Sequence, residues 1–129
     1  MMHKRRGDDR GAAAVEFALV LPLLLVLVLG ILEFGRVFNI QIALSNAARE
    51  GARYMAVHDD PAAATGAAIA AALIDPEISS GQVSITPSSC DGLEDASVEV
   101  TIDYTVELMT GWFGVSLPLE GKGVMICGG

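Results

Sequence analysis

The chain has 129 residues, 52% of them hydrophobic, and its 16 acidic side chains outnumber 8 basic ones for a net charge of −8. This length allows one small domain, or a smaller domain with an appendage. Residues 1–11 carry a net charge of +2, residues 12–56 are neutral, and residues 57–129 carry −10. A nucleic-acid-binding protein is excluded, because no basic face exists beyond the N-terminus. An ordinary soluble domain is disfavoured, because the apolar residues are concentrated at one end.

Residues 12–32 form an apolar stretch long enough to cross a bilayer. Glu16 is its one charged side chain, and residues 17–32 hold neither a charge nor a hydroxyl group. About 20 such residues span the hydrocarbon core as a helix, and the remaining chain is too small to enclose them as a buried core helix. A cleaved signal peptide is the other alternative. However, the run exceeds the usual apolar length of about 7–15 residues, and no Ala-x-Ala pattern follows it.

Basic residues before this stretch indicate its orientation. They are Lys4, Arg5, Arg6 and Arg10, and no comparable cluster follows the stretch directly. The positive-inside rule therefore predicts a cytoplasmic N-terminus and an acidic C-terminal part outside the cytoplasm. The expected location is the cytoplasmic membrane, which the chain crosses once.

Glu16 is the most informative residue of the apolar stretch. A charge near the bilayer centre costs about 2.5–3.5 kcal/mol, and acids at membrane depth are usually functional. Glu16 lies about one helical turn inside the apolar stretch, so its carboxylate can extend to the membrane interface. That explains why a charge is tolerated at this position, but not why a glutamate is found there. It is the fifth residue after Gly11. A basic leader, a glycine, four residues, a glutamate and a long apolar helix together resemble the layout of type IV prepilins.

In that layout a membrane-embedded peptidase would cut after Gly11, where the missing side chain lets the backbone enter a narrow cleft. Ala12 would become the new N-terminus. Its amine and the Glu16 carboxylate are each unfavourable in an apolar bundle. Pairing between neighbouring subunits would satisfy both groups and would set the register between subunits.

Residues 10–22, which read RGAAAVEFALVLP, resemble the start of the TadE-like pseudopilins of the tight-adherence (Tad/Flp) pilus system. The resemblance covers residues 10–56 closely and is carried further by Glu33, Phe34, Gly35, Arg36, Arg49, Glu50, Gly51, Ala52 and Arg53. It implies a non-enzymatic, pilin-like minor subunit that prepilin peptidase processes after Gly11 and that supports assembly of a thin adhesive pilus. It also implies four partners: membrane lipid, the peptidase, other pilin or pseudopilin subunits, and the pilus secretion machinery.

The apolar helix is predicted to continue to about Val57, with residues 12–34 in the membrane and residues 35–57 outside it. Apolar and small residues recur there at three- and four-residue spacing, namely Val37, Ile40, Leu44, Ala47, Ala48, Gly51 and Met55. Pro22 should kink the helix in the membrane, because proline removes a backbone hydrogen bond. Small residues allow close approach of a neighbour, either the protein's own outer domain or another subunit; they are Ala43, Ala47, Ala48, Gly51 and Ala52.

Residues 58–129 are predicted to form a small α+β head. Asp59 and Asp60 end the long helix, Asp60 caps the next one and Pro61 takes its first position. An alanine-rich helix then runs from Ala62 to Ile74 and stops before Asp75-Pro76.

Alternating side chains predict the strands of the head, over residues 83–85, 98–108, 115–119 and 124–126. Residues 111–114 form a turn, and Gly121 and Gly123 mark a bulge or break in the last strand. The fold class is therefore α+β and pilin-like. A long N-terminal transmembrane helix continues into a small extracytoplasmic domain with a short helix and a three- to four-stranded antiparallel sheet.

Cys90 and Cys127 flank the strands of the head. Outside the cytoplasm such a pair can persist as a disulfide, and closing its loop of about 37 residues would contribute roughly 4 kcal/mol. Free, buried thiols are the alternative.

No catalytic, cofactor or metal site is expected. The two cysteines with His3 and His58 lack metal-ligand spacing. Acids four residues apart on one strand lie roughly 13 Å apart, too far for paired acid–base catalysis. We therefore expect neither an enzyme nor a small-molecule substrate. The rival hypothesis is an unprocessed, single-pass, membrane-anchored extracytoplasmic module that binds or senses a ligand.

Overall fold

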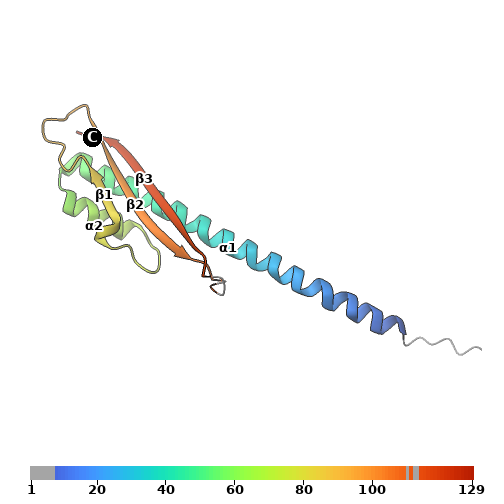
Figure 1. Ribbon diagram of the computed structural model, residues 1–129. Coiled ribbons are helices and arrows are strands. Elements are labelled where there is room, and N and C mark those ends of the chain that lie inside the picture. The colour runs from blue at the N-terminus through green and yellow to red at the C-terminus, as the bar shows by residue number, and fades with distance from the viewer. Residues whose placement is uncertain (1–7, 110, 112–113) are drawn as a thin grey trace, which may run out of the picture. The chain divides into compact units, whose positions relative to one another are not determined.

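The computed structural model describes residues 8–109, 111 and 114–129 (Figure 1). In chain order the elements are α1 (Asp8–His58), α2 (Pro61–Ala71), the 3-10 turn η1 (Ser80–Gln82), β1 (Val83–Thr86), β2 (Ser97–Glu107) and β3 (Ser116–Ile126). This order confirms the α+β prediction of a long helix, a short helix and an antiparallel sheet. The leader residues 1–7, and Trp112 and Phe113 of the predicted turn, lie outside the described residues. The chain forms two compact units, Met1–Gly35 and Arg36–Gly129.

The C-terminal part of α1 supplies much of the core of the second unit. Its fully buried side chains include Leu44, Ala47, Ala48, Ala52 and Met55. They pack with α2 and with the inner face of the sheet, so the predicted helical spacing is confirmed. The small residues of this helix thus pack against the protein's own outer domain, which is the first of the two alternatives.

The junction between α1 and α2 is built from two aspartates. Asp59 has a positive φ of 49° and donates its amide hydrogen to the Met55 carbonyl at 2.9 Å, which closes the last turn of α1. Asp60 caps α2, because its carboxylate accepts the amide of Ala63 at 3.0 Å, and Pro61 takes the first helical position. The predicted cap is therefore confirmed. The helix ends at Ala71, three residues before the predicted Ile74, because Ala72 leaves the helical conformation.

The sheet within the described residues has three strands in the order β1-β2-β3, and both pairings are antiparallel. The central strand β2 alternates as predicted, with its buried side chains facing the helices: Val98, Val100, Ile102, Tyr104 and Val106. Its register with β3 is continuous from the pair Glu107 and Ser116 to the pair Ser97 and Ile126. The bulge or break predicted in β3 is therefore wrong.

Gly121 and Gly123 have a different role, since both are buried on the inner face of β3. A Cβ atom at Gly121 would lie 2.5 Å from the carbonyl carbon and oxygen of Leu44. A Cβ atom at Gly123 would lie 2.5 Å from the same two atoms of Ala48. The backbone of β3 therefore packs directly on the backbone of α1, and only glycine fits at these two positions.

Tyr104 ties the sheet to the segment that follows α2. Its side chain is buried, and its hydroxyl donates a hydrogen bond to the Pro76 carbonyl at 2.8 Å. Burial raises the pKa of Tyr104, the charge of Asp75 raises it further, and the charge of Arg36 opposes the rise. The neutral phenol therefore stabilises the fold below the unfolded pKa of about 10, and this contribution is lost as the pH rises through the folded pKa.

We expect Tyr104→Phe to lower the free energy of unfolding by about 1 kcal/mol near pH 8, because one hydrogen bond is lost. The variant should also show a shallower loss of stability above about pH 10 than the parent chain does. Denaturant unfolding of the full chain in detergent micelles, followed by near-ultraviolet circular dichroism on both sides of pH 10, measures both effects. Tyr54→Phe is the control. If the free energy of unfolding of Tyr104→Phe falls above about pH 10 as steeply as that of the parent chain, this assignment is contradicted.

Candidate membrane anchor and assembly site

The first unit is an exposed apolar helix. Every residue from Asp9 to Leu32 is exposed. The most apolar 18-residue window of α1 has a mean hydropathy of 2.8, and none of that window is buried. Within the described residues, α1 is the one helix that is long and apolar enough to cross a membrane. It is consistent with a single-pass membrane anchor.

The residues predicted for processing and assembly lie near the N-terminal end of α1. Gly11, Ala12 and Glu16 are all helical and exposed. A Cβ atom at Gly11 would have no neighbour within 4 Å, so no structural contact in the described residues requires glycine there. Ala12 and Glu16 are four residues apart, and they therefore lie on the same face of the helix about 6 Å apart along its axis.

Pro22 lies inside α1, and the helix continues through it to His58. Proline has no amide hydrogen for the carbonyl four residues before it, so the turn that precedes Pro22 lacks one backbone hydrogen bond. A kink at this position remains a prediction.

The family-motif residues near the middle of α1 fall on both sides of the unit boundary. Phe34 and Gly35 are exposed, and Glu33 and Arg36 are half-buried. The Arg36 guanidinium donates a hydrogen bond to the Glu107 carbonyl at 2.9 Å. In the second unit Arg36 therefore joins α1 to the end of β2.

The later motif residues divide between the core and the surface. Gly51 and Ala52 are buried, and a Cβ atom at Gly51 would lie 3.0 Å from the Ala68 Cβ of α2. Arg49, Glu50 and Arg53 are exposed, and Arg53 lies 3.9 Å from the Glu50 carboxylate. Two of these five residues therefore build the fold, and the three exposed ones are available for contact with other molecules.

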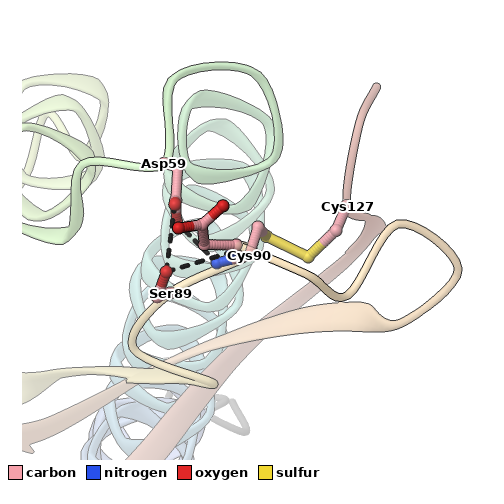
Figure 2. Close-up of a disulfide and its surroundings, with 5 residues drawn as sticks. Asp59, Ser89, Cys90 and Cys127 are labelled. Carbon is pink, nitrogen blue, oxygen red and sulfur yellow. Dashed lines mark hydrogen bonds between the residues drawn. A yellow bond between two sulfur atoms is a disulfide. The ribbon is translucent and has the colours of Figure 1, made fainter.

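The structure joins Cys90 and Cys127 in a disulfide (Figure 2). The two sulfur atoms are 2.01 Å apart and the Cα atoms 5.6 Å apart. Cys127 is buried in a small cluster with Met55, Ala56 and Val98. The bond therefore links the loop before β2 to the end of β3, beside the C-terminal end of α1.

Asp59 is a structural residue whose second role the sequence analysis missed. Its carboxylate accepts hydrogen bonds from the Ser89 hydroxyl at 3.0 Å and from the Cys90 amide (Figure 2). It therefore holds the disulfide loop against the end of α1. An aspartate directly after the last helical residue was the available signal, because Asp tolerates a positive φ better than most residues do.

The acids of the head do not converge on a site. No group of three or more His, Cys, Asp or Glu side chains in residues 8–109, 111 and 114–129 is arranged to hold a metal ion. Lys122 lies on the outer face of β3, 3.2 Å from the Glu99 carboxylate and 3.9 Å from that of Glu120. The hydrogen bond with Glu99 and the charges of both glutamates raise the pKa of Lys122.

Comparison with known proteins adds one finding. Residues 11–53 match the family model described as TadE-like protein, whereas no curated protein and no solved structure gives a significant match. The matched segment begins at Gly11, includes Glu16 and Pro22, and lies entirely within α1. This TadE-like domain supports the assignment of the chain as a TadE-like protein involved in the Tad pilus.

Proposed function

We propose that the chain is a non-enzymatic, pilin-like subunit that assembles into a Tad/Flp adhesive pilus through contacts between proteins. The observation that carries this proposal is the position of Glu16, five residues after Gly11, in an exposed apolar helix that lies within the TadE-like match. The anchor helix crosses the cytoplasmic membrane with its N-terminus inside and its head outside. Its partners are membrane lipid, prepilin peptidase, other pilin or pseudopilin subunits, and the pilus secretion machinery.

Processing is proposed between Gly11 and Ala12. The scissile bond lies in the second turn of α1, which begins at Asp8. Helix ends open at little cost in free energy, so the peptidase can unwind this turn without disturbing the second unit. Cleavage removes the basic leader and leaves a charged amine on Ala12.

We expect the mature protein, purified from membranes that contain the pilus peptidase, to begin at Ala12. N-terminal sequencing or intact-mass spectrometry measures this directly. Gly11→Leu should block cleavage and leave Met1 in place, because a side chain at the cleavage site hinders entry into the peptidase. Gly30→Leu is the matched control, since a Cβ atom there also has open space within 4 Å, and it should be processed normally. An intact Met1 in the parent chain would contradict processing and favour the unprocessed binding or sensing module.

Assembly is proposed to depend on Glu16. Because Ala12 and Glu16 lie about 6 Å apart along the helix axis, a subunit displaced by that distance brings its Ala12 amine level with the Glu16 carboxylate of its neighbour. The apolar surroundings make each charge unfavourable alone. Pairing therefore favours one axial offset between neighbouring subunits.

We expect Glu16→Ala to reduce assembly into pili at least about 100-fold, because breaking a buried ion pair costs about 3–5 kcal/mol. Membrane insertion should be unchanged. Quantitative immunoblots of sheared pili and of membranes measure the two outcomes separately. Glu16→Gln keeps the size of the side chain and removes its charge, so it should fail in the same way. Normal assembly of either variant would remove the proposed role of the carboxylate.

A further inference from the structure

One end of the second unit lies close to the predicted membrane anchor along the chain. Arg36 is the first residue of this unit, and it comes two residues after Phe34, where the anchor is predicted to end. The Arg36 guanidinium donates a hydrogen bond to the Glu107 carbonyl at 2.9 Å. The last residue of β2 therefore lies one arginine side chain away from the residue that follows the anchor. We call this part of the second unit the anchor end.

The connection between β2 and β3 starts at the anchor end. Glu107 pairs with Ser116, and directly beyond this pair the Leu108 amide donates to the Val115 carbonyl at 3.4 Å. The pairing of the two strands thus continues into the connection between them. Residues 108, 109 and 115 therefore lie at the anchor end together with the end of β2 and the start of β3.

Several apolar side chains at the anchor end are exposed, and we call them the apolar patch. They are Phe38 (66% exposed), Met109 (71%), Val115 (52%) and Leu117 (40%). Phe38 is two residues from Arg36, and Leu117 pairs with Val106 near the end of β2. Single exposed apolar side chains are normal on a protein surface, whereas several at one end of a small domain indicate a contact with an apolar partner.

The charges of the head are distributed unequally between its two ends. Residues 36–38 and 108–117 hold one charged residue, Arg36, whereas residues 59–60 and 90–96 hold five acidic residues and no basic one. The latter two segments meet at the opposite end, where the Asp59 carboxylate accepts the Cys90 amide. The exposed cations Arg49, Arg53 and Lys122 lie along α1 and β3 between the two ends. The opposite end is therefore acidic, and the anchor end is apolar with one cation.

Two acidic side chains lie near the apolar patch. Glu107 is the last residue of β2, and Asp75 is close enough to Tyr104 to raise the pKa of its phenol. Both carboxylates are exposed, so both can stay among hydrated lipid headgroups while the apolar side chains enter the membrane. Lipid phosphates attract a cation such as Arg36 and repel the acids of the opposite end.

We propose that the apolar patch inserts into the boundary between headgroups and acyl chains, so that the head rests on the membrane beside its own anchor. The interfacial region on each side of the hydrocarbon core is about 5–8 Å thick, and amphipathic surfaces bury apolar side chains to a similar depth. The partner is a phospholipid surface rather than a second copy, because the patch begins where the anchor ends. The inference rests on the proposed membrane crossing of α1 and does not require processing or pilus assembly.

The test uses the full chain in phosphatidylcholine nanodiscs, with one chain per disc and a nitroxide-labelled lipid whose spin label lies just below the headgroups. In methyl NMR spectra, the signals of Met109, Val115 and Leu117 should lose at least half of their intensity. Val124 should keep most of its intensity. It is a matched control, because it is 52% exposed, as Val115 is, and lies nine residues further along the chain, about 30 Å in an extended strand.

A pair of charge variants tests whether the apolar patch itself makes the contact. Val115→Glu places a charge in the headgroup boundary, and it should reduce the broadening at Met109 and Leu117 at least two-fold. Val124→Glu adds the same charge at the opposite end and should leave that broadening unchanged. Both valines are exposed, so neither change alters the core, and near-ultraviolet circular dichroism of each variant confirms that the fold is kept.

Leu32, near the end of the predicted anchor, separates this inference from the membrane crossing on which it rests. If Leu32 is broadened and Met109 and Val115 are not, the lipid contact of the head is overturned and the crossing stands. If Leu32 also stays sharp, both are overturned. Equal broadening of Val115 and Val124 would show non-specific adhesion, and broadening that appears only with several chains per disc would show contact between copies. Either result would overturn the proposal.

Discussion

Valine at position 123 is expected to unfold the second unit of the protein. A Cβ atom there would lie 2.5 Å from backbone atoms of Ala48 and from the Arg49 nitrogen. Those atoms belong to a helix and cannot rotate away as the end of a side chain can. Overpacking usually costs about 1–3 kcal/mol, and the cost should be higher here because strand and helix must separate. A small domain has only about 5–15 kcal/mol to lose.

Thermal unfolding of the full chain in micelles, followed by near-ultraviolet circular dichroism, measures this effect. Gly66→Ala is the matched control, because a Cβ atom at Gly66 in α2 meets nothing within 4 Å. It should stabilise the fold by up to about 1 kcal/mol, since alanine favours a helix over glycine. A Gly123→Val chain that melts at the parent temperature would contradict the direct contact between β3 and α1.

Loss of the disulfide is the second large effect that we expect. Replacing Cys90 and Cys127 together by alanine should lower the free energy of unfolding by about 4 kcal/mol, because the 37-residue loop is no longer closed in the unfolded chain. The core of the second unit is small, and a loss of this size leaves it marginally stable. Denaturant titration gives the magnitude.

Reduction of the parent chain provides the control for this substitution. Treatment with dithiothreitol should lower the stability of the parent by a similar amount and leave the double variant unchanged. If reduction does not shift the unfolding midpoint of the parent, the bond does not stabilise the fold.

The elements with long periodic patterns were predicted well from the sequence. The helical spacing from Ile40 to Met55 and the alternation from Val98 to Val106 match buried faces of α1 and β2. Both patterns are strong because each buried position is filled by an apolar or small side chain. The composition of residues 12–32 likewise predicted the exposed apolar helix.

The strand β3 was interpreted wrongly for a physical reason. Its inner face is filled at two positions by glycine, which gives no hydrophobic signal although it is buried. Val124 and Ile126, which do give that signal, lie on the exposed face. The branched aliphatic residues are therefore odd-numbered before Gly121 and even-numbered after Gly123, although the strand is unbroken. This change in the alternation resembled the effect of a bulge.

Contacts to backbone groups were not predictable in the same way. Arg36 bonds to the Glu107 carbonyl, and Asp59 accepts the Cys90 amide. Carbonyl and amide groups occur at almost every residue, so residue types alone do not indicate which backbone group a side chain will bond to. The sequence placed Arg36 in the family motif and Asp59 at the end of the long helix, and neither pattern identified a hydrogen-bond partner.

The packing of β3 on α1 also determines when the fold can be completed during synthesis. Leu44 and Ala48 leave the ribosome 77 and 75 residues before their respective partners, Gly121 and Gly123. A contact across so long a stretch of chain forms late, so the apolar face of α1 remains uncovered while the intervening residues are translated. A ribosome that stalls before β3 therefore leaves a chain whose core face on α1 stays exposed, and exposed apolar surface of this kind favours aggregation.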